Sequence, residues 1–328
     1  MPLKLWGFSL GPITVFEKLN SFFPMMELHI IDETAPLKAV VLGTAESCGP
    51  VPKPEAAYDP KSLEHIRNGT YPKEEDMINE MDAFAAVFQK HGVTVYRPEV
   101  IQNCNQIFSR DIAFVIEDKL FHSNILPDRE QEFEAIGHIL KQIDPNKVIR
   151  PPEEVHIEGG DVMPYHEYIF VGTYNGADYS DYITARTNKE AVTYLQEQFP
   201  HKIVKSFELR KSNTNAKENA LHLDCCFQPV GKDKAILHKN GFLVEEEYQW
   251  LMDFFGKENV FEITKDEMYL MFSNVFSISP EVVVSEKKFI RLNQWLRSQD
   301  FIVEEVPYSE IAKQEGLLRC STLPLIRE

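Results

Sequence analysis

The sequence has few cysteines and a deficit of positive charge. Its 328 residues include five cysteines, and 34 Lys and Arg residues are outnumbered by 51 Asp and Glu residues, which gives a net charge of −17. Such a chain lacks the basic surface that displaces counterions from nucleic acid, and it is equally unsuited to docking on anionic lipid. Nucleic-acid and membrane partners are therefore not expected, and a small-molecule substrate remains.

The cysteines are too scattered for the disulfide framework of a small secreted protein. Only Cys225 and Cys226 are neighbours, and no CxxC or CxxH pair offers zinc ligands at a useful spacing. Glycine-rich phosphate-binding loops are missing too, since neither a dinucleotide fingerprint nor a P-loop is present. A reducing, cytoplasmic location is the expectation, and it leaves room for a cysteine nucleophile.

Long hydrophobic runs are also scarce. The stretch from Leu5 to Phe16 is apolar, but glycine and proline interrupt it, no A-x-A-like cleavage site follows, and it is too short to span a bilayer. We expect residues 1–26 to form an N-terminal extension, with Met25 or Met26 as an alternative start. Residues 27–328 are expected to form one compact domain.

From Glu27 onward, short β-rich runs alternate with amphipathic helical stretches. Strands are predicted at Lys38–Gly43, Val93–Tyr96, Ile112–Ile116, Tyr168–Gly172, Lys234–Leu237, Glu281–Ser285 and Phe301–Val306. One helix is predicted to begin at Tyr71, and others to cover Asp128–Gln142, Asn188–Gln198, Glu245–Phe255 and Lys287–Ser298. Five rounds of roughly 60 residues predict a repeated α/β architecture rather than one doubly wound sheet.

Four local strings place titratable side chains among small or apolar residues. They are Phe108-Ser-Arg-Asp111, His156-Ile-Glu-Gly-Gly-Asp161, His222-Leu-Asp-Cys-Cys-Phe227 and Arg319-Cys-Ser-Thr-Leu-Pro324. Taken alone, each has an ordinary structural explanation. The first is typical of a salt-bridged strand end, the second of a solvated turn, and the third of a surface His–Asp pair, while a lone cysteine is typical of a packed core.

The residue types in these strings also suit chemistry on a cation. If His222-Leu-Asp224 lies in a strand, residues i and i+2 share one face, and the imidazole and carboxylate point into the same space. The two glycines of Glu158-Gly-Gly-Asp161 allow close backbone approach to a ligand. Cys320, together with a distant histidine and carboxylates, completes a minimal set of nucleophile, general acid/base and positioning groups.

In this order and spacing the strings resemble the guanidino-group-modifying enzymes: arginine deiminases, dimethylarginine dimethylaminohydrolases and arginine:glycine amidinotransferases. The resemblance extends from about Glu27 to Glu328 and is strongest at Arg110-Asp111, Glu158–Asp161, Ala185-Arg-Thr187, His222–Asp224 and Arg319–Leu325. These enzymes share a five-bladed α/β propeller with pseudo-fivefold symmetry. The resemblance therefore implies this fold class, and the five predicted rounds agree with it.

The resemblance implies a role for each matching residue. Cys320 matches the cysteine that attacks the guanidinium carbon, and His222 matches the histidine that shuttles protons. Asp111, Asp161 and Asp224 match carboxylates that bind the guanidinium nitrogens. Carboxylates around the rim of a planar cation would fix its plane for attack along the perpendicular.

The arginines near these strings are expected to have different roles. Arg186 is the first candidate, and Arg319 the second, to pair with a substrate α-carboxylate. Arg110 could instead be structural. The reaction implied by the resemblance is covalent, passes through a thiouronium-type intermediate on Cys320, and requires no metal or organic cofactor.

Two enzyme activities follow from the resemblance. A hydrolase acting on arginine or a close analogue, such as methylated arginine or agmatine, would use water to cleave the intermediate. An amidinotransferase would use an amine acceptor instead, and the sequence does not separate the two. A homo-oligomer is compatible with either.

The sequence departs from the family pattern at two places. The cysteine loop reads Glu315-Gly-Leu-Leu-Arg-Cys320 rather than a run of glycines, and residues 173–182 form an insertion that is expected to cover the pocket. A non-catalytic guanidine-binding protein is a further alternative, but the retention of Cys320 and His222 argues against it. A Cys–His protease or a transglutaminase-like enzyme would need a local signature around the cysteine that is missing.

Overall fold

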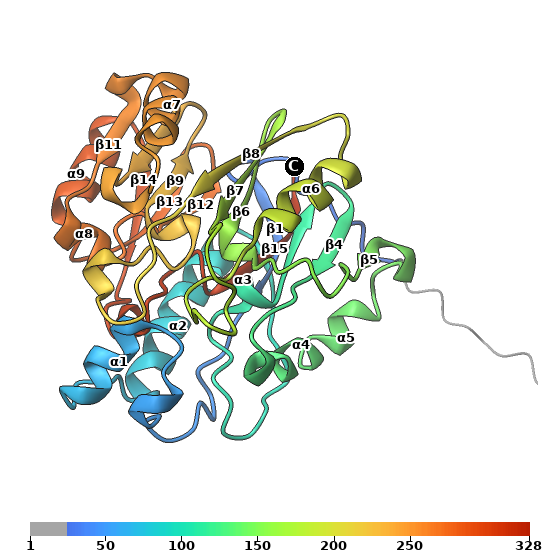
Figure 1. Ribbon diagram of the computed structural model, residues 1–328, viewed down its shortest axis with the longest axis vertical. Coiled ribbons are helices and arrows are strands. Elements are labelled where there is room, and N and C mark those ends of the chain that lie inside the picture. Colours follow the sequence, from blue (N-terminus) through green and yellow to red (C-terminus); the bar gives the residue numbers. More distant parts are fainter. Residues whose placement is uncertain (1–24) are drawn as a thin grey trace, which may run out of the picture.

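The computed structural model describes residues 25–328, so all but the end of the predicted N-terminal extension lies outside the described residues (Figure 1). The strands are β1 (Leu37–Leu42), β2 (Thr94–Tyr96), β3 (Ala113–Ile116), β4 (Lys119–His122), β5 (Val148–Ile149), β6 (Val162–Tyr165), β7 (Tyr168–Thr173), β8 (Ile203–Glu208), β9 (Phe227–Val230), β10 (Lys234–Leu237), β11 (Val260–Glu262), β12 (Phe276–Ser279), β13 (Val282–Glu286), β14 (Ile302–Val306) and β15 (Thr322–Arg327). The α-helices are α1 (Pro60–Arg67), α2 (Glu74–Lys90), α3 (Ser109–Ile112), α4 (Gln131–Glu134), α5 (Gly137–Leu140), α6 (Lys189–Gln198), α7 (Glu245–Phe255), α8 (Lys265–Tyr269) and α9 (Ile290–Ser298).

The strands form five three-stranded sheets of one pattern. Four sheets use consecutive strands, in the orders β3-β4-β5, β6-β7-β8, β11-β10-β9 and β12-β13-β14. The remaining sheet has the order β15-β1-β2, so the last strand of the chain completes the sheet that the first strand begins. The five sheets fit the five predicted rounds, and the α/β class is confirmed.

Each sheet is built from a hairpin and a crossover. The middle strand pairs antiparallel with the first strand of the sheet and parallel with the third. In β6 and β7, for example, the pairing runs from Val162↔Val171 to Tyr165↔Tyr168, so two residues make the turn. The third strand arrives only after helical structure, because a parallel pairing needs a long crossover connection.

The sequence prediction missed strands β4, β5, β6, β8, β9, β11, β12 and β15, and three of these share one feature. Strands β6, β9 and β15 contain Pro164, Pro229 and Pro324, respectively. Proline cannot donate to a strand ladder, so it argues against a central strand and is tolerated at a sheet edge. All three strands lie at the edge of their sheets.

The helix predicted over Asp128–Gln142 is wrong as a continuous element. The segment contains a single 3-10 turn followed by the short helices α4 and α5. The carbonyl of Ala135 accepts the backbone N–H of Glu99 from a distant segment at 2.8 Å, and Gly137 follows two residues later. This external hydrogen bond and the glycine together interrupt the helical ladder between α4 and α5.

The long helix α2 shows how the core is assembled. It begins at Glu74 rather than at Tyr71, and its buried residues Met77, Met81, Phe84 and Phe88 recur with helical spacing. The ring of Phe84 meets the rings of Phe276 and Tyr308 edge-on, with centroids 5.9 and 5.6 Å apart. Such contacts join α2 to β12 and to the segment after β14.

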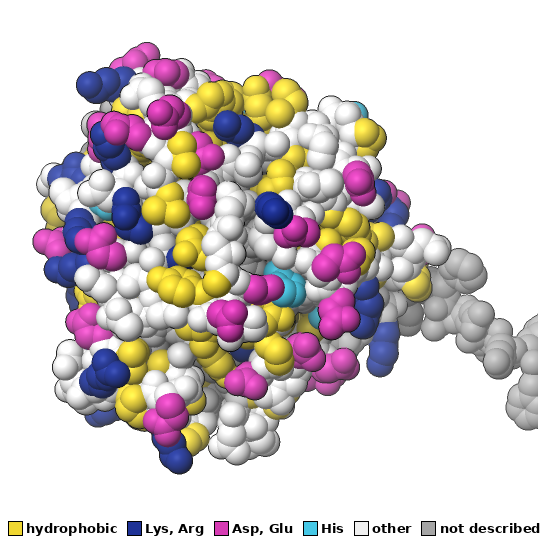
Figure 2. Space-filling model, viewed as in Figure 1, with side chains coloured by type: hydrophobic (Ala, Val, Ile, Leu, Met, Phe, Trp, Pro, Cys, Tyr) yellow, Lys and Arg dark blue, Asp and Glu magenta, His cyan; other side chains and the backbone are white. Residues whose placement is uncertain are grey.

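The described surface carries charges of both signs. On the face shown in Figure 2, Lys and Arg side chains are scattered among Asp and Glu side chains and form no continuous basic area. Across residues 25–328, none of the helices has both the length and the apolar character needed to cross a membrane.

Candidate active site

A cavity of about 400 Å³ lies beside the segments that precede strands β3, β9 and β15. Its wall includes Asp111, Arg186, His222 and Cys320, which are four of the six residues singled out from the sequence. The other two, Asp161 and Asp224, are fully buried and do not belong to the wall. The remainder of the wall is largely apolar and aromatic, with Tyr58, Ile66, Tyr71, Met77 and Phe108 among its residues.

Cys320 lies two residues before β15 and is held from two sides. Its Sγ is 3.1 Å from Nδ2 of Asn274 and 3.5 Å from Oδ2 of Asp224. Burial, followed by the charges of Asp224 and Asp111, raises the pKa of the Cys320 thiol well above its usual range. The raised pKa favours the protonated sulfur, which donates its hydrogen toward Asp224.

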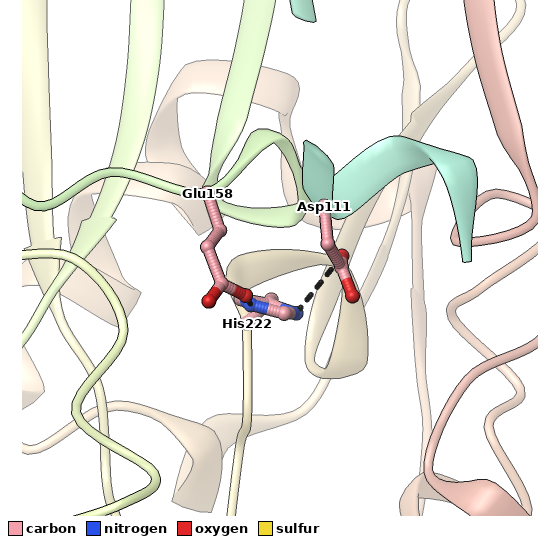
Figure 3. Close-up of side chains that lie close together, drawn as sticks. All are labelled: Asp111, Glu158 and His222. Carbon is pink, nitrogen blue, oxygen red and sulfur yellow. Dashed lines mark hydrogen bonds and ion pairs between the residues drawn. The ribbon is translucent and has the colours of Figure 1, made fainter. Parts of the chain in front are cut away.

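The imidazole of His222 lies between two carboxylates (Figure 3). Its Nε2 is 2.7 Å from Oε2 of Glu158, and its Nδ1 is 3.8 Å from Oδ1 of Asp111. Although burial lowers the pKa of His222, the nearby carboxylates of Asp111, Glu158 and Asp161 outweigh it, and the net shift is upward. His222 is therefore stabilised as the imidazolium, with one N–H bound to Glu158 and the other directed to Asp111.

His222-Leu-Asp224 does not lie in a strand, so the expectation that its two polar side chains share one face is wrong. His222 has extended backbone and caps a 3-10 turn that covers Leu223–Cys225, and β9 begins only at Phe227. The i and i+2 side chains therefore do not point into one space. His222 turns to Glu158, whereas Asp224 turns to Cys320 and Arg319.

Asp161 stabilises this turn through a hydrogen bond to its backbone. Its Oδ1 accepts the backbone N–H of Leu223 at 2.8 Å, and the side chain has no exposed surface. Burial raises the pKa of Asp161 despite the nearby positive charge of His222. The structure thus brings Asp161 to the backbone of the histidine string rather than to the cavity.

The two glycines between Glu158 and Asp161 are explained by close packing. A Cβ on Gly159 would lie 2.2 Å from the carbonyl oxygen of Arg110, and a Cβ on Gly160 would collide with the ring of His222. Neither glycine has a positive φ, so space rather than backbone conformation requires them.

All the hydrogen bonds of Arg319 are to buried groups of the protein itself. It has no exposed surface, and it donates to both carboxylate oxygens of Glu33, to Oδ2 of Asp224 at 2.9 Å, and to the carbonyl oxygens of Gly160 and Val162. It therefore connects the loop that contains Cys320 to Asp224 and to the segment Gly160–Val162. Arg110 is also buried near Glu33, at 3.7 Å, and its contacts are likewise internal.

Arg186 lines the cavity while holding Glu158. Its Nη1 donates to the two oxygens of Glu158 at 3.2 and 3.1 Å, Nε donates to the carbonyl of Ile183, and Nη2 donates to the carbonyl of Tyr58. A guanidinium has five N–H donors. Since only one contact involves Nη2, a donor of Arg186 remains for a ligand.

Three residues that contact His222, Asp111 or Cys320 were not assigned a role from the sequence. Glu158 was noticed only as part of a turn, although it makes the shortest contact with His222. Arg129 donates to Oδ2 of Asp111 at 2.9 Å and is itself held by Glu132 in a two-bond pair. Asn274 belongs to none of the four strings, and no strand was predicted directly after it, so nothing in the sequence indicated its role.

The insertion 173–182 does not line the cavity, in contrast to the sequence expectation. Its Asp178 accepts a hydrogen bond at 2.9 Å from Nδ1 of His156, and the ring of Tyr179 packs on His156 with centroids 4.4 Å apart. The insertion therefore packs on the residues that precede Glu158.

Asp111, Glu158 and His222 offer ligand atoms that all lie within 4.8 Å of one another. A small cation would fit that spacing, but both oxygens of Glu158 already accept from Arg186, and Oδ2 of Asp111 accepts from Arg129. The imidazolium of His222 occupies the same space with its own positive charge. The described cluster therefore already contains a positive charge, that of His222, between its two carboxylates.

The sequence matches a family model and a bacterial relative. The sequence model described as N,N dimethylarginine dimethylhydrolase, eukaryotic, matches residues 53–327. The uncharacterized protein YkgA of Bacillus subtilis (strain 168) is 30% identical over 225 residues, which cover 68% of this chain and 70% of YkgA.

Solved structures share the fold at low sequence identity. The N-terminal domain of ArgZ, a cyanobacterial arginine dihydrolase, superposes with a TM-score of 0.72 and 15% identity, covering 88% of this chain and 97% of that one. SxtG, an amidinotransferase from Microseira wollei, gives 0.71 and 16% identity, with 92% and 97% covered. The chain belongs to the N,N-dimethylarginine dimethylhydrolase family of the guanidino-group-modifying enzymes.

Proposed function

We propose that the protein hydrolyses the guanidino group of arginine or a close analogue through a covalent intermediate on Cys320. The observation that carries this proposal is the meeting of Cys320, His222 and Asp111 on the wall of one cavity, with Glu158 directly behind His222. A thiol, a protonated imidazole and a carboxylate are the groups that attack on a cationic carbon requires.

The substrate cation activates the nucleophile. The guanidinium carbon must come to about 3–3.5 Å from the sulfur to be attacked. Asp111 is proposed to bind the rim of the guanidinium from the cavity wall. Asp224 does not line the cavity, and its proposed contact with the guanidinium is from beside the sulfur, since its Oδ2 is 3.5 Å from Sγ. The positive charge lowers the pKa of the Cys320 thiol, which releases its proton to solvent and attacks as the thiolate.

His222 then acts in both half-reactions. As the imidazolium it gives its proton to the departing amine, the C–N bond breaks, and a thiouronium remains on Cys320. As the neutral imidazole it takes a proton from water, which adds to the same carbon and releases the thiolate. Glu158 stabilises the imidazolium and fixes the orientation of the ring.

Two further residues have proposed roles around this centre. Arg186 is proposed to receive a substrate α-carboxylate with its remaining Nη2 donor while it holds Glu158. Asp161 is proposed to act through the turn at Leu223, because its side chain lies away from the cavity.

An amidinotransferase is the second candidate. SxtG carries that activity in its description, and ArgZ is described as an arginine dihydrolase, so the shared fold accommodates both outcomes. The two differ in the bond that breaks. The hydrolase loses the terminal amine and keeps the substrate chain on the sulfur, whereas the transferase loses the chain and keeps only the amidino group.

We further propose that residues 27–328 form a single catalytic unit in which the five sheets close as the blades of a propeller around the cavity. The supporting observation is that the segment before the first strand of each sheet contributes to the centre: Asp111 before β3, Glu158 before β6, His222 before β9, Asn274 before β12 and Cys320 before β15. The proposed chemistry needs no cofactor and suits a reducing cytoplasm, where Cys320 stays a thiol.

The intermediate distinguishes the candidates. The protein would be incubated with arginine, dimethylarginine or agmatine, quenched in acid and analysed by intact mass spectrometry, while ammonia, amine, ureido product and ornithine are assayed. We expect an adduct on Cys320 that retains the substrate chain, and a ureido product formed with no amine acceptor. Ornithine released only when an acceptor amine is added would establish the transferase, and undiminished turnover by Cys320→Ser would overturn the covalent reaction.

A further inference from the structure

The segments before the first strands of the five sheets are equivalent positions, and four of them supply groups with a proposed role. The fifth, before β12, supplies the pair Ser273 and Asn274, both without exposed surface. Asn274 lies two residues before β12, just as Cys320 lies two residues before β15 and Asp111 two residues before β3. Asn274 therefore occupies the position in its repeat that Cys320 and Asp111 occupy in theirs.

Asn274 is bonded to the nucleophile through both ends of its carboxamide. Oδ1 accepts the backbone N–H of Cys320 at 3.2 Å, and Nδ2 lies 3.1 Å from Sγ of the same residue. Its backbone carbonyl accepts the N–H of Arg319 at 3.4 Å. Three contacts thus join Asn274 to two consecutive residues of the cysteine loop.

The chemistry fixes which way the carboxamide faces. The backbone N–H of Cys320 can only donate, so it must meet the oxygen of Asn274, and the nitrogen must then face the sulfur. Nδ2 also approaches the carbonyl of Asp224 at 3.4 Å, and that carbonyl would repel an oxygen placed there. Both neighbours therefore select the same orientation.

The sulfur consequently has an acceptor on one side and a donor on the other. Asp224 accepts from the neutral S–H, whereas the N–H of Asn274 can bind only a sulfur lone pair. A hydrogen bond from a neutral donor is stronger to an ionised acceptor than to a neutral one. The contact to Asn274 therefore gains strength when the thiol ionises, and the contact to Asp224 loses its proton.

We infer that Asn274 is a positioning residue that holds the Cys320 thiolate on the line of attack through its side-chain N–H. The inference rests on the proposed function, because it gives Asn274 a purpose only if Cys320 reacts as a thiolate. The hydrogen bond from Asn274 lowers the pKa of Cys320, in opposition to the larger effects of burial and Asp224. Loss of the donor should thus reduce both the thiolate population and its alignment.

The test uses Asn274→Leu, which keeps the shape but removes the donor, and Ser273→Ala as its matched control. Ser273 donates to the carbonyl of Asp224 at 2.8 Å, the same carbonyl that Asn274 approaches, but it has no contact with the sulfur. Alkylation of Cys320 by iodoacetamide would be followed from pH 6 to 10 by peptide mass spectrometry. A hydrogen bond to a charged group supports an expected loss of about 10- to 100-fold in alkylation rate near neutral pH for Asn274→Leu. The Ser273→Ala rate should stay close to that of the wild type.

Turnover gives a second readout. We expect kcat of Asn274→Leu to fall by a similar factor of about 10–100 with little change in KM, because the amide acts on the sulfur rather than on the substrate. Asn274→Asp retains an acceptor for the N–H of Cys320, and it should lose as much activity, since its carboxylate opposes a thiolate. If Asn274→Leu is not folded by circular dichroism, Asn274→Asp carries the same test.

The outcomes separate this inference from the proposed function. Wild-type alkylation profiles and kcat in folded Asn274→Leu or Asn274→Asp would overturn the role of Asn274, even if Cys320→Ser is inactive. Full activity of Cys320→Ser would instead overturn the proposed function. An equal loss in Ser273→Ala and Asn274→Leu would show that Asn274 supports Asp224 alone, and this too would overturn the inference.

Discussion

The ring of His222 packs against the α-carbon of Gly160 so closely that a Cβ built on Gly160 would lie 2.6 Å from both Cγ and Nδ1 of the ring. Real Cβ atoms do not approach other atoms to that distance, so any larger residue must displace the imidazole. His222 would then leave its 2.7 Å contact with Glu158. The absence of a side chain at Gly160 therefore helps to fix the orientation of the His222 ring.

Gly160→Ala should consequently lower activity far more than it lowers stability. Misplacement of a catalytic group by about 1 Å can cost on the order of 100-fold in rate, and we expect kcat to fall by at least that factor. Gly137→Ala is the matched control, because a Cβ on Gly137 meets no atom within 4 Å and the residue begins helix α5. Steady-state kinetics would give kcat for both variants. Equal kcat values for Gly160→Ala and Gly137→Ala would contradict the steric role of Gly160.

Two buried histidines are expected to show opposite pH dependences of stability. The pKa of His222 is raised, so its protonated form contributes stability that is fully present below its ordinary pKa of about 6.5. That contribution is lost as the pH rises through the higher pKa of the folded state. Burial lowers the pKa of His238, so its contribution is instead present at high pH and is lost as the pH falls.

Urea unfolding of the wild type, His222→Asn and His238→Asn between pH 5.5 and 9 measures both effects. The difference in unfolding free energy between the wild type and His222→Asn should shrink as the pH rises. For His238→Asn the same difference should shrink as the pH falls. A difference for His222→Asn that grows with pH would mean that the imidazole is neutral between Glu158 and Asp111.

The four strings could be recognised from the sequence because their titratable residues are close together in the chain and form unusual combinations. Asp111, His222 and Cys320 come from three such strings and line one cavity. Contiguity does not determine side-chain direction, however. The alternation rule applied to His222 and Asp224 assumed a strand, whereas the backbone forms a 3-10 turn that sends the two side chains to different partners.

Residues whose importance comes from tertiary contacts gave no local signal. Asn274 lies between Ser273 and Val275 in a stretch with no recognisable motif, and its contact with Cys320 joins positions 46 residues apart in the chain. The edge strands with Pro164, Pro229 and Pro324 were lost because a single sequence does not reveal which strand lies at an edge. Four of the five middle strands, β1, β7, β10 and β13, were predicted, and so were the edge strands β2, β3 and β14, none of which contains proline.

Asp161 offers a test of whether a carboxylate near the site acts directly. Its Oδ1 accepts the N–H of Leu223, and Asp161→Ala leaves that buried donor without a partner, at a cost of about 1–3 kcal/mol in stability. Asp161→Asn keeps an oxygen acceptor but removes the charge. We therefore expect the Asn variant to recover both stability and KM relative to the Ala variant.

Denaturant unfolding and kinetics of both Asp161 variants would provide the comparison. A KM raised equally in Asp161→Asn and Asp161→Ala, with Asn near wild-type stability, would place the charge of Asp161 at the guanidinium after all. That result would require the side chain to leave Leu223 when substrate enters.

Arg186 is expected to have two separable effects on catalysis. It holds Glu158 through Nη1, and its remaining Nη2 donor is proposed to bind a substrate α-carboxylate. Agmatine is arginine without that carboxylate, so it reports only the first effect. Arg186→Gln should lower kcat/KM for both substrates because Glu158 loses its cation, and breaking a buried pair is costly.

For arginine the loss should be larger by a further factor of about 10–100, which corresponds to one hydrogen bond between charged partners. The measured quantity is the ratio of kcat/KM for arginine and agmatine in the wild type and in Arg186→Gln. Arg319→Gln is the contrasting variant, because all its contacts are internal and its replacement should affect both substrates alike. An unchanged ratio in Arg186→Gln would mean that Arg186 serves Glu158 alone and that the carboxylate is bound elsewhere in the cavity.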